Sequence, residues 1–137
     1  MKLCDTSVLV DIDRGGIDEK VRRLDEQGRH AISLVTVTEL RLGVHLRYDQ
    51  GTDQFRSAMD GLDRLLARFE IVPLEPPIAN AAADVMGALR AEGQPIDDLH
   101  DIYIAATAKV RQLPLLTANV ADFERVADIE VIDWTAF

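Results

Sequence analysis

The chain has 137 residues, 47% of them hydrophobic, and a formal net charge of −9, so we expect one domain over residues 1–137 that can bury a core. The acidic balance argues against a simple nucleic-acid binder, which usually has a basic excess. A lone cysteine, Cys4, excludes an internal disulfide, and apolar runs too short for a signal peptide or membrane helix predict a cytoplasmic protein without membrane contact.

Short apolar runs alternate with longer amphipathic segments along the chain, which is typical of an α/β fold with a parallel sheet. Apolar runs predict strands over residues 2–5, 30–35, 71–74, 115–117 and 130–132. Apolar residues at helical spacing predict helices over residues 17–27, 36–46, 52–69, 78–92 and 98–112. We therefore expect a parallel sheet of about five strands with helices on both faces.

Polar residues stand where the predicted strands end. Asp5 closes the first strand, and Asn119 follows the strand over residues 115–117 by two positions. Ligands of open parallel sheets bind outside the carboxyl ends of the strands, where the strand order reverses. The helix starts that carry Glu39 and Asp101 should face the same edge, so the sequence predicts a convergence of acids there.

A capping residue followed three positions later by an acid occurs at three predicted helix starts: Thr36 and Glu39, Asp98 and Asp101, Asn119 and Asp122. The capping box explains this spacing without any function. A carboxylate in the first turn also stays ionised beside the positive end of the helix dipole, and can bind a hard cation. Asp101 opens an apolar helix and Asp5 ends an apolar strand, so capping explains these two less well, although Asp5, Thr6 or Ser7 could each cap the segment that follows.

A set of acids without Cys or His ligands favours Mg²⁺ or Mn²⁺ over zinc. Mg²⁺ keeps several of its waters, so one or two direct carboxylates are enough, and further acids can hold those waters. An ion bound in this way can activate water and stabilise the charge on a phosphodiester.

Four segments resemble PIN domains of VapC-type toxins, in particular the branch that includes FitB-like proteins: KLCDTSVLVDI, VTVTELRLGV, PIDDLHDIYIAATAKV and LLTANVADFERV. The resemblance runs in order from Lys2 to about Trp134. It implies a PIN-like three-layer α/β/α fold and an Mg²⁺- or Mn²⁺-dependent endoribonuclease that hydrolyses RNA with metal-activated water. It also implies the toxin role in a type II toxin–antitoxin pair, with RNA, a small antitoxin and a second copy of the chain as partners.

By the same resemblance, the first three acids of the family site fall on Asp5, Glu39 and Asp101, with Asp5 and Asp101 as direct metal ligands. The fourth position falls on Asn119, where several relatives carry Asp, and Asp122 is the next available carboxylate. Asn119 can offer a carbonyl oxygen or hold a water, but it brings no charge. Both residues stay open for this position.

Several neighbouring residues are candidates for supporting roles. The hydroxyls of Thr6, Ser7 and Thr117 could hold the acids or bound waters, or could make ordinary turn and cap hydrogen bonds. Arg14 and Arg41 are candidates for phosphate contacts, or are solvated surface charges. His100 is expected to face away from the site, because successive helical residues point in directions about 100° apart.

Two other functions remain open. Asp11 and Asp13 form an acid-x-acid pair after apolar residues, which resembles haloacid-dehalogenase-like phosphatases at this point alone. The exposed side of a short helix is the better interpretation of this pair. A catalytically weakened PIN-fold binding protein would fit Asn119 and the negative charge. If the protein dimerises, we expect exposed apolar surface on the helices over residues 52–69 and 78–92.

Overall fold

The structure is a computed structural model that describes all residues from Met1 to Phe137. The strands are β1 (Leu3–Cys4), β2 (Ala31–Ser33), β3 (Glu70–Val72), β4 (Leu115–Thr117) and β5 (Val131–Asp133). The helices are α1 (Thr6–Arg14), α2 (Asp18–Asp25), α3 (Leu34–Arg47), α4 (Asp53–Leu66), α5 (Pro76–Ala91), α6 (Leu99–Arg111) and α7 (Val120–Phe123), followed by a short 3-10 helix (Trp134–Ala136). The predicted strands are all present, although most are shorter than expected and β5 is displaced by one residue.

The five strands form one sheet in the order β3-β2-β1-β4-β5, and all neighbouring pairs are parallel. The chain builds outward from β1 to β2 and β3, and then crosses to the other side of β1 to add β4 and β5. The strand order therefore reverses between β1 and β4. This switch point is where a ligand site is expected in an open parallel sheet.

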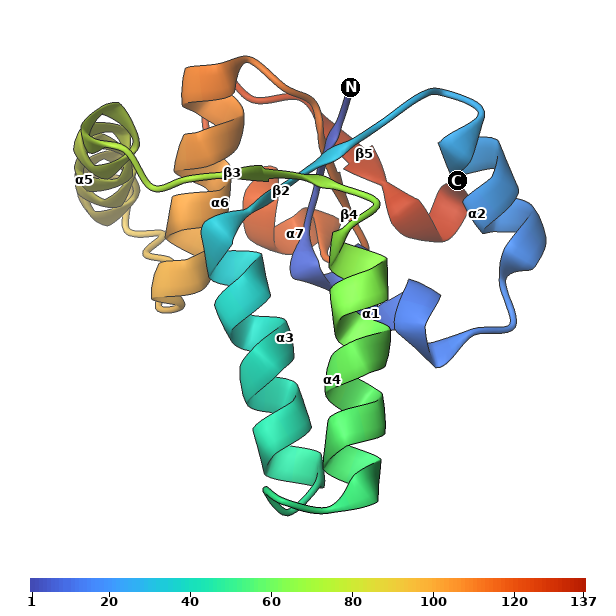
Figure 1. Ribbon diagram of the computed structural model, residues 1–137. Coiled ribbons are helices and arrows are strands. Elements are labelled where there is room, and N and C mark those ends of the chain that lie inside the picture. The colour runs from blue at the N-terminus through green and yellow to red at the C-terminus, as the bar shows by residue number, and fades with distance from the viewer.

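Each face of the sheet has its own hydrophobic core, because successive side chains of a strand point to opposite faces. Leu3 and Leu115 belong to a core of 16 buried residues shared with α5, α6 and α7. Cys4 and Leu116 belong to a core of 11 buried residues shared with α1, α2 and α4. Figure 1 shows the resulting three layers, with the α3–α4 hairpin projecting beyond the sheet. The predicted α/β/α architecture with a parallel sheet of five strands is confirmed.

Helix α6 is central to one of these cores. Five of its small or apolar residues are at most 1% exposed: Ile102, Ile104, Ala105, Ala106 and Ala108. Their burial against the sheet and α5 fixes the helix in position, and with it the acid that stands in its first turn. The helix ends at Gln112, whose φ of 54° lies in the left-handed region.

Helix α3 begins earlier than the sequence predicts. Its N-cap is Ser33, whose side chain accepts a hydrogen bond from the backbone N of Val35 at 3.2 Å. Thr36 therefore lies inside the first turn, and Glu39 lies in the second turn. The expected capping box of Thr36 and Glu39 is wrong, because a serine at the end of β2 already caps the helix.

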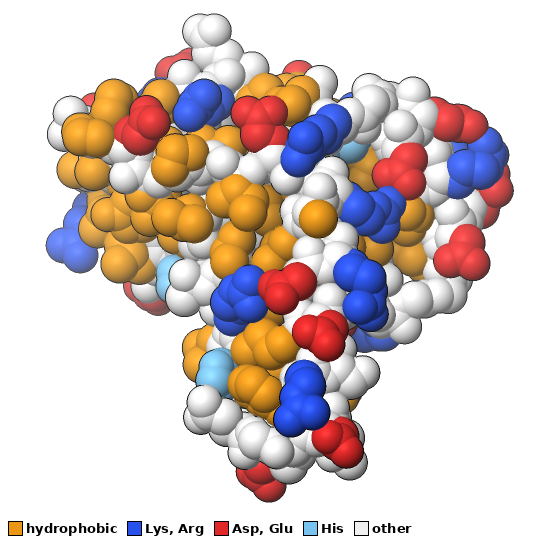
Figure 2. Space-filling model, viewed as in Figure 1, with side chains coloured by type: hydrophobic (Ala, Val, Ile, Leu, Met, Phe, Trp, Pro, Cys, Tyr) orange, Lys and Arg blue, Asp and Glu red, His pale blue; other side chains and the backbone are white.

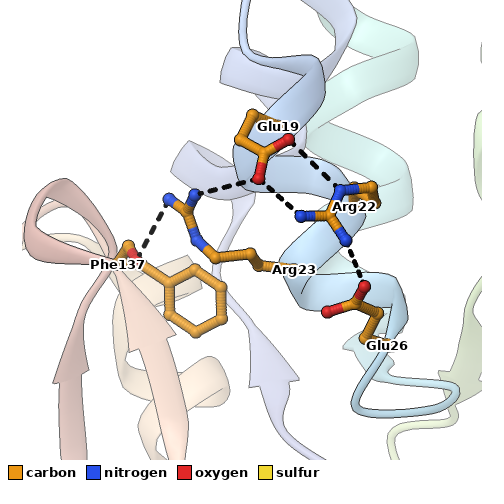
Figure 3. Close-up of polar contacts among 5 residues, drawn as sticks. All are labelled: Glu19, Arg22, Arg23, Glu26 and Phe137. Atoms are coloured by element: carbon orange, nitrogen blue, oxygen red, sulfur yellow. Dashed lines mark hydrogen bonds and ion pairs between the residues drawn. The ribbon is translucent and has the colours of Figure 1, made fainter.

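Helix α2 is a polar surface helix with close ion pairs, drawn in Figure 3. Arg22 pairs with Glu19 and with Glu26, and Arg23 donates to the backbone O of Phe137 at 3.3 Å. Exposed pairs of this kind add little stability. They do, however, engage two arginines, which lowers the number of free cations on this side of an acidic protein.

Exposed large apolar side chains gather on other elements than we expected. Helix α3 exposes Leu34, Leu42 and Leu46, the last at 78%, and the end of the β3 segment exposes Ile71 and Leu74. Helix α4 buries its leucines and exposes no large apolar side chain, whereas the exposed apolar residues of α5 are small, among them Ala79, Ala83 and Ala88. The expected apolar surface is therefore absent from the helix over 52–69 and is made of small side chains on the helix over 78–92. Figure 2 shows apolar side chains over the β3 and α5 side of this face and on the α3–α4 hairpin.

None of the helices has both the length and the apolar character that a membrane crossing needs.

His30 joins three segments and makes folding sensitive to acid. Its Nδ1 accepts from the backbone N of Lys2 at 3.0 Å, and its Nε2 lies 3.0 Å from the backbone O of Leu24, so the neutral ring satisfies both. Burial lowers the pKa of His30 below its ordinary value, since the ring is only 3% exposed. The unfolded chain therefore takes up a proton first as the pH falls, and the stability that His30 contributes above about pH 6.5 should be lost below it.

We expect His30→Phe to lower the free energy of unfolding at pH 8 by about 1–3 kcal/mol, because both backbone groups lose their partner. The difference between wild type and variant should shrink as the pH falls from 8 to 5, and denaturant titrations at both pH values measure it. A difference that does not change with pH would contradict the proposed role of the neutral ring.

Candidate active site

Asp5 stands at the carboxyl end of β1, beside the switch point. Its side chain is 3% exposed, and although Asp5 occupies the N-cap position of α1, its carboxylate makes no cap hydrogen bond. Oδ2 accepts from Ser7 Oγ and from Thr117 Oγ1, both at 2.8 Å. The hydroxyls thus hold one carboxylate oxygen and leave Oδ1 without a partner in the protein. Thr117 comes from the end of β4, so these bonds tie the two strands that flank the switch point.

Glu39 reaches the same region from α3. Its Oε1 accepts from Thr6 Oγ1 at 2.8 Å, and its Oε2 lies 3.6 Å from His100 Nδ1. Burial raises the pKa of Glu39, while the hydrogen bond from Thr6 and the charge of His100 act in the opposite direction. The charges of Asp98 and Asp5 raise it further, which places Glu39 within electrostatic reach of both acids.

Asp101 is the third residue of α6, and the helix is capped by Asp98, whose Oδ1 accepts from the backbone N of His100 at 2.8 Å. Burial raises the pKa of Asp101 from 3.8 to about 7, and four carboxylates add to this effect: Asp98, Asp5, Asp122 and Glu39. Asp101 and Asp5 have no ion pair with any Lys, Arg or His. The acids expected to converge from sequence therefore form one cluster that repels itself.

The fourth acid position remains divided between two residues on the short helix α7. Asn119 is its N-cap without a side-chain cap bond, and its backbone N donates to Thr117 Oγ1 at 2.9 Å. Asp122 lies three residues further, is exposed, and is one of the charges that raise the pKa of Asp101. Asn119 is thus linked to the site through Thr117, whereas Asp122 acts on it through its charge.

His100 contradicts the expectation that it faces away. It does diverge from Asp101 along α6, but this direction brings its ring to Glu39 on α3. Helical geometry within α6 could not show this, because the acid that it meets comes from another helix. Sequence reasoning also missed a role for Thr36, whose hydroxyl contacts Thr6 Oγ1 at 3.0 Å; its place three residues before Glu39 was the available signal.

The two arginines suggested for phosphate contact are differently placed. Arg41 pairs with Asp63 of α4, with a distance of 2.7 Å between Nη2 and Oδ1, so it braces the α3–α4 hairpin. Arg14 ends α1, is largely exposed, and lies 3.9 Å from Asp11. Asp11 and Asp13 lie within α1 rather than at a strand end, and Asp11 accepts from Trp134 Nε1 at 3.1 Å. The phosphatase alternative is therefore wrong, because its nucleophile must stand at a strand end.

The residues of the cluster fit a hard divalent cation, although no three of the His, Cys, Asp and Glu side chains close around one point as a finished cage. Their donors are carboxylate oxygens, the buried Asp5 keeps one oxygen free, and burial together with repulsion from neighbouring carboxylates raises the pKa of Asp101. Mg²⁺ and Mn²⁺ need only one or two direct carboxylates when waters complete the shell. A cation here would also relieve the repulsion among the acids.

Comparison with known proteins agrees with this arrangement. The PIN-domain family matches residues 2–129, and the chain belongs to this family. Ribonuclease VapC1 from Methanocaldococcus jannaschii is 35% identical over 127 residues, which are 92% of this chain and 81% of that protein. The predicted resemblance to VapC-type PIN domains is confirmed.

Solved structures resemble the whole chain. FitAcB from Neisseria gonorrhoeae superimposes with a TM-score of 0.84 at 31% identity and covers 100% of both chains. VapBC-5 from Mycobacterium tuberculosis, a member of the VapBC family of toxin–antitoxin systems, gives a TM-score of 0.70 at 28% identity, with coverage of 96% of this chain and 97% of that chain. The predicted likeness to the FitB-like branch is also confirmed.

Proposed function

We propose that the protein is a metal-dependent endoribonuclease and the toxin of a type II toxin–antitoxin pair. One observation carries the proposal: Asp5, Glu39 and Asp101 gather at the β1/β4 switch point without a protein cation to neutralise Asp5 and Asp101. The ribonuclease name of the VapC1 relative supports RNA as the substrate. The proposed reaction is hydrolysis of an RNA phosphodiester that leaves a 5′-phosphate and a 3′-hydroxyl, carried out by one domain over residues 1–137.

Asp5 and Asp101 are the proposed direct ligands of Mg²⁺ or Mn²⁺. Glu39 and either Asn119 or Asp122 are proposed to complete the site by holding water around the cation. When bound, the cation supplies Lewis acidity for the phosphate and promotes ionisation of the attacking water. Ser7 and Thr117 hold the Asp5 carboxylate in one orientation, so that its free oxygen stays directed at the site.

Two observations support further proposals about the partners of the protein. The toxin–antitoxin assignment of VapBC-5 supports a small antitoxin protein as the inhibitor. The exposed leucines of α3 support a homodimer, because unpaired apolar stripes favour self-association. A toxin that acts on RNA and is inhibited by an antitoxin meets both in the cytoplasm, so we place the protein there.

Incubation of total cellular RNA with the purified protein tests the proposed activity. We expect discrete fragments with 5′-phosphate ends in Mn²⁺ or Mg²⁺, and none in chelator. Absence of cleavage with either metal, in protein shown by mass spectrometry to be free of a copurified antitoxin, would contradict the nuclease assignment. Such a result would favour the weakened binding protein that Asn119 also fits.

The fourth position can be tested by adding the charge that Asn119 lacks. We expect Asn119→Asp to lower the Mn²⁺ concentration needed for half-maximal cleavage by roughly fivefold. A unit charge about 8 Å from a divalent cation in water-like surroundings contributes about 1 kcal/mol. Gln54→Glu adds the same charge at the exposed start of α4 and serves as the control. An equal response of both variants would show that only the overall charge matters.

A further inference from the structure

The hydroxyls that hold the acids of the site are themselves held. Ser7 Oγ, which donates to Asp5, accepts from the backbone N of Ala118 at 3.1 Å. Thr117 Oγ1, which also donates to Asp5, accepts from the backbone N of Asn119 at 2.9 Å. A hydroxyl has one proton and can rotate, so a second donor on its oxygen fixes the direction in which that proton points.

Thr6 plays the same part for Glu39, but its second donor is a side chain. Thr6 Oγ1 donates to Glu39 Oε1 at 2.8 Å and lies 3.0 Å from Thr36 Oγ1. An ionised carboxylate only accepts, so the single proton of Thr6 goes to Glu39. Thr36 must therefore donate to Thr6, and the three groups form a relay in one direction, from Thr36 through Thr6 to Glu39.

Thr36 has no other visible use for its hydroxyl. The side chain is 0% exposed, and its contact with Thr6 is the only hydrogen bond that it makes. It lies one turn before Glu39 on α3, on the same side of the helix, while Thr6 reaches both residues from the first turn of α1. A valine of nearly the same shape would fill the space, so packing alone does not call for a hydroxyl here.

We propose that Thr36 is a positioning residue of the site, which acts through Thr6 to hold the Glu39 carboxylate. This inference rests on the proposed nuclease function and extends it to a buried residue that substrate does not reach. The hydroxyls that hold Asp5 receive their second hydrogen bond from backbone N–H groups, which an ordinary side-chain substitution leaves in place. The hydroxyl of Thr6, which holds Glu39, receives it from the side chain of Thr36, which a substitution can remove.

Thr36→Val removes the hydroxyl and keeps the shape of the side chain. We expect a loss of kcat of about three- to tenfold and a similar loss of Mn²⁺ affinity, measured by calorimetry on the RNA-free protein. This is at or below the roughly 10- to 100-fold loss typical of groups that directly support metal ligands, because Thr36 acts through a second hydroxyl. Thr36→Ser keeps the hydroxyl and should restore both. Thr107→Val is the matched control, because Thr107 is an equally buried helical threonine whose hydroxyl donates to the backbone O of Tyr103.

A double-mutant cycle separates the relay from a general structural effect. If Thr36 acts only through Thr6, Thr36→Val should change neither kcat nor Mn²⁺ affinity further in a Thr6→Val background. The relay alone would be overturned if the losses in the double variant were additive. It would also be overturned if the wild type binds Mn²⁺ and cleaves RNA and the Thr36→Val protein does both equally well. A wild type that neither binds Mn²⁺ nor cleaves RNA would overturn the proposed function and the relay with it.

Discussion

Replacement of Asp5 by asparagine should abolish RNA cleavage, with a loss of at least about 100-fold in kcat/KM. Loss of a group that only supports a metal ligand already costs up to about 100-fold, so loss of a direct ligand should cost at least as much. Asp5 is the most buried acid of the cluster, and it stands at the end of the central strand. Asparagine keeps the size of the side chain but removes the charge that a cation requires. A steady-state assay on a fluorescent RNA, over a range of Mn²⁺ concentrations, measures the effect.

The fold should survive this change. Ser7 and Thr117 can still donate to the oxygen of the new amide when it occupies the position of Oδ2, so the ties between β1 and β4 remain. Asp13→Asn removes the same charge from the exposed side of α1 and is the matched control. Normal turnover in the Asp5→Asn protein would contradict the assignment of the metal site, whereas a lost melting transition would show that Asp5 serves the fold.

Asp101→Asn should have the second large effect. It should lower RNA cleavage, because a proposed metal ligand loses its charge, and it should raise the stability of the metal-free protein. In the metal-free protein, the raised pKa of Asp101 means that the folded state holds a proton more tightly than the unfolded chain. The stability that this proton contributes is full below about pH 3.8 and is lost as the pH rises to about 7. Asparagine avoids that loss, so the variant should melt higher than wild type at pH 8, by about 3 °C if the gain is near 1 kcal/mol.

Thermal melts in chelator at pH 4 and pH 8 measure this prediction. The gain of the variant should vanish near pH 4, and the contribution of His30 cancels because both proteins contain it. With Mn²⁺, the order should reverse, since wild type gains stability from the bound cation and the variant gains less. Asp84→Asn, at an exposed position of α5, should show neither effect. A variant that melts below wild type at pH 8 in chelator would contradict the crowding of charge around Asp101.

The elements of this fold were largely readable from the sequence. Strand β4 was predicted with its observed bounds, and the apolar pattern of α6 correctly predicted a buried helix. Errors occurred at element ends, as at α3, where Ser33 caps the helix before Thr36 can. Several residues within one or two positions can serve as the N-cap, and which of them does so depends on where the preceding strand leaves the sheet.

Contacts between elements were less accessible than the elements themselves. The pattern around Asp101 could not show that His100 meets Glu39, nor could the sequence show that Arg41 pairs with Asp63. Each of these pairs joins residues on different helices, so their meeting depends on how the helices cross. Local periodicity carries no information about that crossing.

The sequence by itself determined the alternation of strands and helices, the acids at their ends and the resemblance that named the family, because these depend on local patterns and spacing. The tertiary structure alone decided which groups act on one another: the carboxylates that repel around Asp101, the hydroxyls that hold Asp5, and the link from Thr36 through Thr6 to Glu39. Those relations arise where β1 and β4 lie side by side and α1 meets α3, and residues far apart in the chain come into contact only there.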